Sequence, residues 1–259
     1  MDLGISGRSA LICASSAGLG FACAKALVAE GVEVTINGRD SGRLEKAADE
    51  LNQMGLAKVN YVSGDVCSQA GREKILDSCP HPDILLNNNA GPSAKQFSDT
   101  DPQDWESTLD GNMVAPLMMI QAVLPKMIER KFGRIVNITS AMVTTPRPHH
   151  VLSSGARAGL TASSKAISIE VARHNVTINN LLPERIDTNR QHQMAEAAMK
   201  RENISYEEAR KLQVESIAAG RLGRPEEFAA AFAFLCSANS GFISGQNIHV
   251  DGGSYPALI

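Results

Sequence analysis

The sequence predicts an α/β fold, a doubly wound parallel sheet of about seven strands with helices on both faces. Two observations predict it. First, short apolar segments alternate with helix-length segments along the whole chain, as expected where a crossover helix follows each strand. Second, the apolar segments are nearly continuous rather than alternating, which is typical of strands that are buried on both faces of a parallel sheet.

The expected elements follow in chain order. A strand at 10–14 (ALICA) precedes a glycine-containing turn and the helical pattern FACAKALVAEG, and a strand at 32–37 precedes a helix that Gly55 stops. A third strand ends at Asp65. The other four strands are expected at 83–89, 133–140, 176–183 and 246–253. Right-handed crossovers between parallel strands make the doubly wound arrangement the natural topology.

Composition bounds the class of protein. At 259 residues, with 43% hydrophobic and 20% charged residues, the chain fits one globular domain that spans 1–259. A net charge of −3 with interspersed signs gives no electrostatic basis for binding nucleic acid or an anionic membrane. The five cysteines lack metal-ligand spacing, so we expect no metal site and free thiols in a reducing compartment. A cytoplasmic protein is expected.

The first candidate site is the turn CASSAGLG at 13–20. Gly18 and Gly20 allow the backbone to approach a pyrophosphate, and the N-terminus of the following helix supplies N–H groups and a favourable dipole. Small residues also serve the close packing of a helix on a strand, so the turn alone leaves both interpretations open.

Further motifs lie at later strand ends and on helices: GDV at 64–66, NNNAG at 87–91, LDGNMVAP at 109–116, GRIVNITS at 133–140 and a closing segment at 220–254. With the glycine turn, they resemble the short-chain dehydrogenase/reductase (SDR) family over about 9–255, and 3-oxoacyl-(acyl-carrier-protein) reductases in particular. The resemblance implies a Rossmann-like, single-domain fold that binds a nicotinamide dinucleotide. The register of 87–91 stays open by one residue. The implied cofactor-binding residues are Ala14, Ser16, Gly18, Leu19, Gly20, Arg39, Asp65, Val66, Asn88, Asn89, Ala90, Arg157, Pro183, Ile186 and Thr188.

The end of the second strand indicates which dinucleotide binds. An acidic side chain there would favour NAD by accepting hydrogen bonds from the adenosine ribose, whereas this chain has Gly38 and Arg39. A guanidinium can fork onto a 2′-phosphate, and the hydroxyl of Ser16 could add a contact. The alternative is that Arg39 is a solvated residue at the start of a loop. We predict NADP(H).

The resemblance implies four catalytic positions. Asn112 corresponds to the helix asparagine that holds a proton-relay water, and Ser140 corresponds to the serine that orients the substrate. Thirteen residues separate Ser140 from Ser153, the usual separation of the family's serine and tyrosine. Ser153 therefore stands at the tyrosine position, and Arg157 stands at the position of the lysine.

These departures change the chemistry that is available. A serine hydroxyl is a poor proton source, and an arginine stays protonated, so Arg157 can bind ribose hydroxyls or stabilise an alkoxide without relaying a proton. His149 and His150 precede Ser153 and could act as general acid or base, or they are ordinary polar loop residues. Glu184 is a further departure, because the family usually has a glycine there.

Two functions remain open. In the first, the protein is an NADP(H)-dependent oxidoreductase that reduces a 3-oxoacyl or other ketone carbonyl by hydride transfer, with an atypical proton relay. In the second, it is a catalytically inactive nucleotide-binding homologue that acts as a sensor or partner subunit. The segment at about 189–220 is expected to form a substrate lid. By resemblance, the helices at 117–127 and 156–171 are expected to build the dimer interface of a homotetramer, a dimer of dimers.

Overall fold

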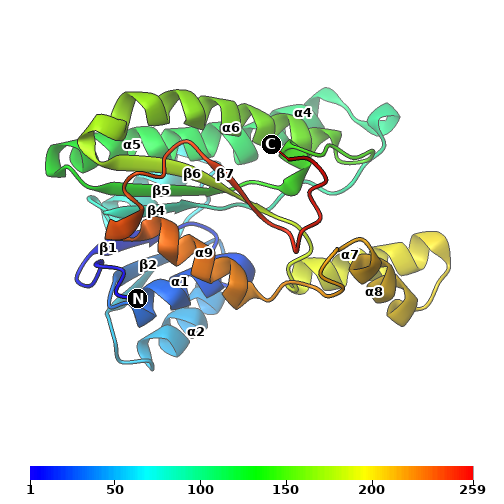
Figure 1. The fold of residues 1–259 in the computed structure, drawn as a ribbon, viewed down its shortest axis with the longest axis horizontal. Coiled ribbons are helices and arrows are strands. Elements are labelled where there is room, and N and C mark those ends of the chain that lie inside the picture. The colour runs from blue at the N-terminus through cyan, green and yellow to red at the C-terminus, as the bar shows by residue number, and fades with distance from the viewer. Residues whose placement is uncertain (259) are drawn as a thin grey trace.

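The computed structural model describes residues 1–258, within which seven parallel strands form one sheet in the order β3-β2-β1-β4-β5-β6-β7 (Figure 1). The strand order reverses between β1 and β4, and parallel sheets bind ligands at such a switch point, beyond the carboxyl ends of the strands. The predicted doubly wound parallel sheet is confirmed. The strands are β1 (Ser9–Ile12), β2 (Glu33–Gly38), β3 (Val59–Ser63), β4 (Ile84–Asn87), β5 (Gly133–Ile138), β6 (Val176–Pro183) and β7 (Asn247–Val250).

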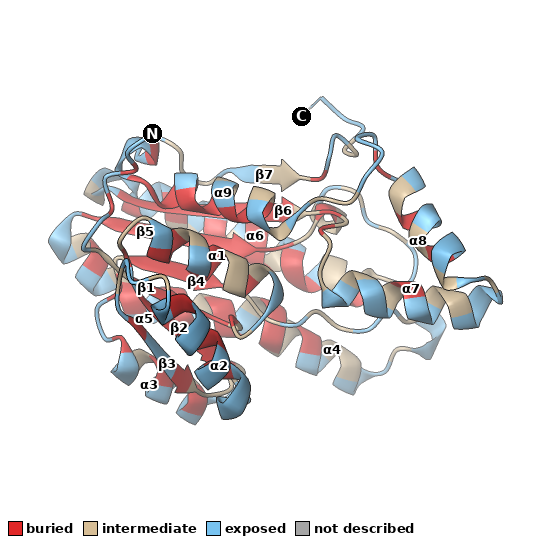
Figure 2. Cartoon of the chain, turned by 90° about the horizontal axis from the view of Figure 1, so that it is seen from below, coloured by how far each residue is buried: buried red, intermediate tan, exposed pale blue. Residues whose placement is uncertain are grey.

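Helices cover both faces of the sheet. One face carries α1 (Gly18–Ala29), α2 (Ser41–Asn52) and α9 (Pro225–Cys236) (Figure 1). The other face carries α3 (Gln69–Ser78), α4 (Pro102–Leu109), α5 (Ala115–Arg130) and α6 (Val151–Val171). A separate apolar core joins each helical layer to the sheet, and burial is most continuous along the strands themselves (Figure 2).

Two further helices, α7 (Asn189–Glu202) and α8 (Tyr206–Glu215), project from the body of the molecule after β6 (Figure 1). Their residues are mostly exposed or half-buried (Figure 2). The Nε2 of Gln213 on α8 donates to the carbonyl oxygen of Gln191 at 2.9 Å, which ties the two helices together. They occupy the segment that the sequence predicts as a lid.

Several strands end earlier at the carboxyl edge than the sequence predicts. β4 ends at Asn87 rather than at 89, and β5 ends at Ile138 rather than at 140; β1, β3 and β7 are also shorter. The reason is that polar residues beyond the strands take other partners. Asn89 Nδ2 donates to the carbonyl oxygen of Gly111 (3.0 Å), and the hydroxyl of Ser140 accepts from a backbone N–H of a 3₁₀ turn.

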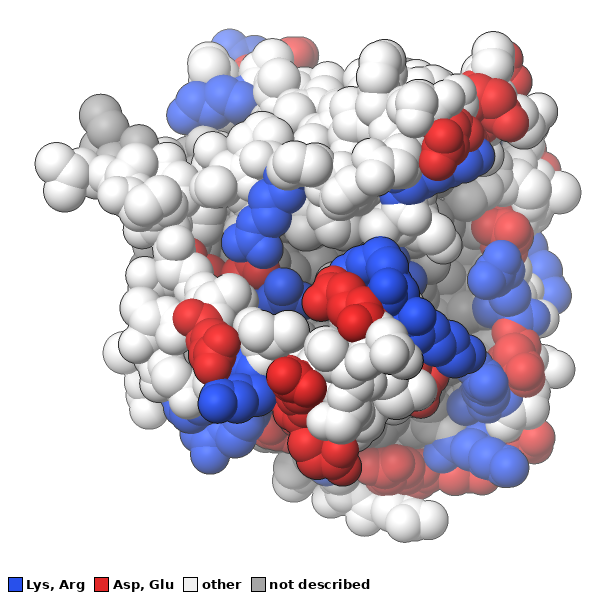
Figure 3. Space-filling view, turned by 90° about the vertical axis from the view of Figure 1, so that its right-hand side faces the viewer, with Lys and Arg blue, Asp and Glu red and all other residues white. Residues whose placement is uncertain are grey.

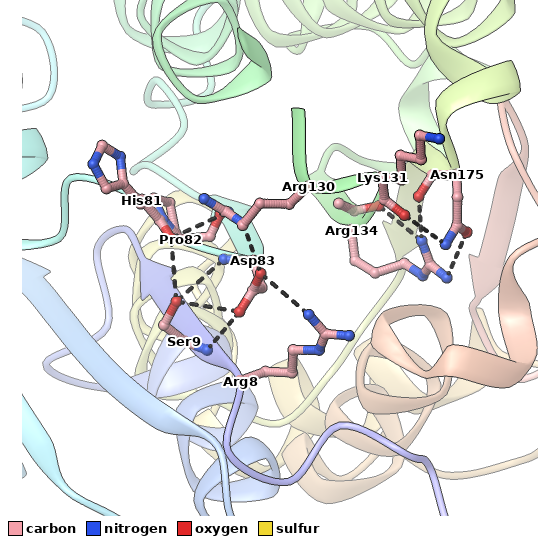
Figure 4. Close-up of polar contacts among 10 residues, drawn as sticks. Arg8, Ser9, His81, Pro82, Asp83, Arg130, Lys131, Arg134 and Asn175 are labelled. Atoms are coloured by element: carbon pink, nitrogen blue, oxygen red, sulfur yellow. Dashed lines mark hydrogen bonds and ion pairs between the residues drawn. The ribbon is translucent and has the colours of Figure 1, made fainter. Parts of the chain in front are cut away.

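The amino edge of the sheet is held by two polar clusters (Figure 4). Asp83, at the start of β4, forms ion pairs with Arg8 and Arg130 at 3.5 and 3.3 Å. The buried guanidinium of Arg134, on β5, bonds to the backbone and side-chain oxygens of Asn175 at 2.9 and 3.2 Å. These groups fix the edge that lies opposite to the expected site.

The stretch Pro102–Arg130 joins α4, a π-helical turn and α5, and by length and composition it could cross a membrane. A single helix of this kind is weak evidence for a membrane-spanning segment. Met119, Ile120 and Met127 of α5 are buried in the core beside the sheet, so we interpret α5 as a core helix.

Candidate active site

The turn between β1 and α1 has the geometry of a phosphate cradle. A Cβ on Gly20 would lie 2.5 Å from the carbonyl oxygen of Ala14, so only glycine lets the helix pass this close to the strand end. Gly18 takes a φ of +61° and begins α1, and the half-buried Leu19 packs against the core. Among the described residues no side chain caps α1, which leaves its first N–H groups free to bind an anion.

A cavity of about 250 Å³ adjoins this turn. At its rim a Cβ on Gly38 would lie 3.4 Å from the Ser16 hydroxyl, so these two residues and Arg39 lie together. Arg39 is exposed and has no hydrogen bond or ion pair within residues 1–258, which leaves its guanidinium available to a ligand. The predicted cofactor residues that line the cavity are Ala14, Ser16, Arg39, Asp65, Val66, Asn89 and Ala90.

Asn37 holds this cavity in shape, and the sequence analysis did not assign it a role. Its buried side chain donates to the carbonyl oxygens of Val62 and Gly64 at 3.2 and 3.1 Å. Its Oδ1 accepts from the backbone N–H of Ala14 at 3.4 Å. The ends of β1, β2 and β3 are therefore tied to one amide. In the sequence, an asparagine at the end of an apolar strand was the available signal of this role.

The three consecutive asparagines have different partners. Asn87 is buried in β4, where its amide donates to Asn137 Oδ1 at 2.9 Å. Asn88 Nδ2 donates to the carbonyl oxygen of Ala14 at 3.0 Å, and Asn89 lines the cavity. Asn88 and Asn89, the two predicted residues, thus adjoin the glycine turn and the cavity, while Asn87 belongs to the interior of the sheet.

Asn112 lies in a π-helical turn (Asp110–Val114) between α4 and α5, an irregularity that is frequent at functional sites. Its Nδ2 donates to the carbonyl oxygen of Ala90 at 3.4 Å, while its buried Oδ1 has no partner among the described residues. A Cβ on Gly159 of α6 would lie 2.6 Å from the sulfur of Met113, so this glycine lets α6 pack closely on the turn. An unpartnered buried acceptor is expected to bind a water or a ligand.

Arg157 is buried on α6 and reaches the carboxyl edge of the sheet. Its Nη1 donates to the carbonyl oxygen of Ile138, at the end of β5, at 2.6 Å. Its Nη2 would lie 3.4 Å from a Cβ on Gly91. Burial, with the charge of Arg190, lowers the pKa of Arg157 to about 10, so the guanidinium remains charged at neutral pH. Asn112 and Arg157 therefore flank the loop that carries Ala90 and Gly91.

The other predicted catalytic residues lie at the same edge. Ser153 is one turn before Arg157 on α6, so both side chains lie on one face of the helix. Ser153 is half-buried, and within residues 1–258 its hydroxyl has no hydrogen-bond partner. Ser140 lies two residues beyond the end of β5, where it precedes a 3₁₀ turn. Burial, and then the charges of nearby arginines and of His149, lower the pKa of His150, which is therefore neutral at pH 7 and a poor proton donor.

Of the predicted cofactor residues at and beyond the end of β6, Thr188 reaches the glycine turn. Pro183 is the last residue of β6. Ile186 is buried and forms a parallel bridge with Gly223. The methyl carbon of Thr188 would lie 4.0 Å from a Cβ on Gly18, which places this threonine at the start of α1. Segments far apart in the sequence thus meet at one edge.

A family model described as enoyl-(acyl carrier protein) reductase matches residues 13–255. The chain belongs to the short-chain dehydrogenase/reductase family. The NADPH-dependent reductase BacG of Bacillus subtilis is 34% identical, covering 98% of this chain and 100% of that protein. The 3-oxoacyl-[acyl-carrier-protein] reductase FabG of Aquifex aeolicus is 32% identical with the same coverage. The structure of L-sorbose reductase from Gluconobacter frateurii, complexed with NADPH and L-sorbose, has a TM-score of 0.94 at 27% identity and full coverage of both chains.

The residues of this SDR protein fit a nicotinamide dinucleotide. The uncapped start of α1 and the close approach at Gly20 form a cradle for a pyrophosphate. The cavity beside Arg39 is open to the adenosine end of such a molecule, and the unpartnered Oδ1 of Asn112 lies toward the other end of the switch point.

One departure from the SDR pattern builds a cluster that the sequence analysis did not foresee. Glu184 is 7% exposed, and its carboxylate lies 3.1 Å from Arg147 and 3.5 Å from Arg185. Arg147 precedes α6, so this acidic side chain ties the loop before Ser153 to the end of β6. A glycine at this position could not make that connection.

Proposed function

We propose that this SDR protein is an NADP(H)-dependent oxidoreductase that reduces a ketone carbonyl to an alcohol, with Asn112, Ser140, Ser153 and Arg157 as its catalytic residues. The observation that carries the proposal is that Asn112 and Arg157 both contact the loop at Ala90 and Gly91. A buried cation and an unpartnered acceptor there serve charge stabilisation and proton transfer.

When bound, NADPH supplies the hydride, and the chain's own residues must orient the carbonyl and manage its proton. The hydroxyls of Ser140 and Ser153 donate hydrogen bonds to the carbonyl oxygen. The guanidinium of Arg157 stabilises the negative charge that develops on that oxygen, because a cation in a dry site is far more effective than one in water. Neutral His150 is a poor proton donor, so we propose that a water held by Asn112 Oδ1 relays the proton from bulk solvent to the carbonyl oxygen and is itself reprotonated from solvent.

We further propose that Arg39 selects the phosphorylated cofactor. NADPH should bind more tightly than NADH, and Arg39→Ala should weaken NADPH binding about 10-fold or more while NADH binding is nearly unchanged. Fluorescence titration of both dinucleotides measures this. Equal affinities of the unmutated protein for the two dinucleotides would contradict the assignment.

The decisive experiment separates an enzyme from an inactive homologue. Purified protein is supplied with NADPH and a panel of ketones and 3-oxoacyl thioesters, and the loss of NADPH absorbance is followed. Turnover supports the proposal. If NADPH binds, no carbonyl is reduced and Ser153→Tyr with Arg157→Lys confers activity, then the site as it stands is inactive and the binding role replaces the enzymatic one.

We also propose how the chain is organised: a cytoplasmic, single-domain subunit of 1–259 with a lid at about 189–220, assembled as a homotetramer. The support for the assembly comes from exposed apolar side chains. These are Val114 in the π-helical turn before α5, Met118 on α5 and Ile169 on α6. Exposed apolar faces on neighbouring helices are typical of subunit interfaces. Light scattering that detects a stable monomer would contradict the assembly.

A further inference from the structure

A second cavity, of about 510 Å³, lies between the lid helices and the loops of the candidate active site. Ser93 and Ala94, two residues beyond the loop at Gly91, line one side, together with His149 and His150 before α6. Residues of α7 and α8 line the other side. A cavity of this volume fits a small organic molecule, and it is lined by the loop that leads into Ser153, which makes it the candidate substrate cavity of the proposed reductase.

Its charged side chains are mostly positive. Arg185, Arg190 and Arg201 line it, and Glu202 is its acidic lining residue among those described. Arg201 is already paired with Glu202 at 2.6 Å. Figure 3 looks onto this face, where Lys and Arg side chains border a recess next to the lid helices. Arg185 and Arg190 therefore provide positive charge that the cavity itself does not neutralise.

Arg190 lacks an acidic partner within residues 1–258. Its Nη2 donates to the carbonyl oxygen of Pro92 at 3.0 Å, which positions the guanidinium over the loop that follows Gly91 but leaves its charge uncompensated. Its charge helps to lower the pKa of the buried Arg157, so the two guanidiniums are close enough to repel. Repulsion between unpartnered cations is relieved by an anion that binds between them.

Arg185 is held in place at a conformational cost. Its φ of +53° is a left-handed conformation that a non-glycine residue adopts only at an energetic cost. Its guanidinium shares the carboxylate of Glu184 with Arg147, so one negative charge faces two positive ones. Its buried Nε makes no hydrogen bond with the described residues, although it lies 3.5 Å from Glu184. His149, across the same cavity, also has a positive φ, of +66°. Such strain clusters at ligand-binding sites.

We propose that this cavity binds the carboxylate of an oxo acid through Arg190 and Arg185, so that the substrate is an anionic ketone of low molecular mass. This inference rests on the proposed reductase function. Met194, Ala198 and Leu212 add an apolar part to the wall, which fits a short hydrocarbon chain. Guanidinium forks match the planar, bidentate geometry of a carboxylate.

The test compares matched substrates that differ only in charge. Oxo acids with the carbonyl at carbon 2, 3, 4 or 5 are each compared with their own methyl ester, and a 3-oxoacyl-coenzyme A thioester is included. The kcat/KM of the best acid should exceed that of its ester by about 10- to 100-fold, the range for charge-assisted hydrogen bonds. A preference for the thioester over every free acid, or equal values for acid and ester, would overturn the proposal.

Variants then assign the preference to the two arginines. Arg190→Gln should raise KM for the acid about 10-fold or more and change KM for the ester much less, and Arg185→Gln should act in the same direction. Lys200→Gln is the matched control, because it removes the same charge from an exposed position of α7 that does not line the cavity. If Lys200→Gln lowers the preference as much as Arg190→Gln does, the effect is a general one of net charge.

A binding measurement separates this proposal from the reductase function. The protein loaded with NADPH is melted with and without an oxo acid or its ester. Stabilisation by the acid alone, lost in Arg190→Gln, supports the anion site even where no turnover occurs, in which case the reductase function fails by itself. Turnover of neutral ketones without stabilisation by any acid gives the reverse result: a reductase without the anion site.

Discussion

Two arginines are buried near opposite ends of the sheet, and their surroundings differ. Arg134, at the amino end of β5, donates to the carbonyl oxygens of Gly133, Asn175 and Ser237, and Figure 4 shows its contacts with Asn175. Arg157, at the carboxyl edge, donates to one carbonyl oxygen among the described residues. Burial lowers the pKa of both. The first guanidinium has hydrogen bonds that compensate its burial, whereas the second keeps donors free, as a residue that acts on a ligand must.

Backbone strain divides in the same way. Within residues 1–258, six non-glycine residues have a positive φ. Lys131, Asn175 and Asn203 follow directly on helices, where a left-handed residue is a common way to end the helix. The other three, Ala14, His149 and Arg185, line the two cavities of the candidate site. Strain at the helix ends serves folding, while strain at the carboxyl edge requires a different explanation, and ligand binding supplies one.

The comparison predicts its largest effect at Arg157. Arg157→Ala should lower kcat about 100- to 1000-fold, because it removes the cation that stabilises charge on the reacting oxygen. The loss of one hydrogen bond should lower the free energy of unfolding by only about 1 kcal/mol. Steady-state kinetics and chemical denaturation measure the two quantities on one preparation. An unchanged kcat would mean that the guanidinium is structural.

Arg134 should behave in the opposite way. Arg134→Ala removes three hydrogen bonds to backbone carbonyl oxygens and leaves a cavity in place of a large, fully buried side chain. The free energy of unfolding should therefore fall by about 3 kcal/mol or more. Activity per folded molecule should be unchanged, because the residue is remote from the candidate site. Chemical denaturation, monitored by circular dichroism, measures the stability of the variant. A stable but inactive variant would contradict the prediction that Arg134 serves stability and not activity.

The features of the carboxyl edge differ in how far the sequence predicts them. The parallel sheet, the glycine turn and the departures at Ser153 and Arg157 follow from apolar runs and from motif spacing, which are local. The pairing of Arg147 and Arg185 with Glu184 is not local, since it joins a loop before α6 to the end of β6. The same holds for Asn37, whose contacts cross three strands. Such contacts depend on three-dimensional packing, so the unusual residue type is visible in a single sequence but its partners are not.

A pH profile sharpens the role of Arg157. Its pKa of about 10 keeps the cation charged at neutral pH and lets it lose charge only as the pH rises through that value. Lysine has an ordinary pKa about two units below that of arginine, and the same burial would lower it further. Turnover of Arg157→Lys should therefore fall as the pH rises through about 8, while the unmutated protein stays active there. If turnover of the variant and of the unmutated protein falls at the same alkaline pH, the charge of residue 157 does not control the rate.

The smallest expected effect concerns Ala14, where a residue other than glycine takes a φ of +46° at the cofactor cradle. Ala14→Gly removes the steric cost of a left-handed alanine, about 1–2 kcal/mol, and adds back some chain entropy in the unfolded state, about 0.5–1 kcal/mol. The net gain in the free energy of unfolding should be up to about 1 kcal/mol. The carbonyl oxygen that accepts from Asn88 and the N–H that donates to Asn37 belong to the backbone, so both contacts persist and NADPH affinity should not fall. Urea denaturation measures the free energy of unfolding, and dinucleotide titration measures the affinity for NADPH. If the variant is less stable than the unmutated protein, the packing of the Ala14 methyl group contributes more to stability than its left-handed conformation costs.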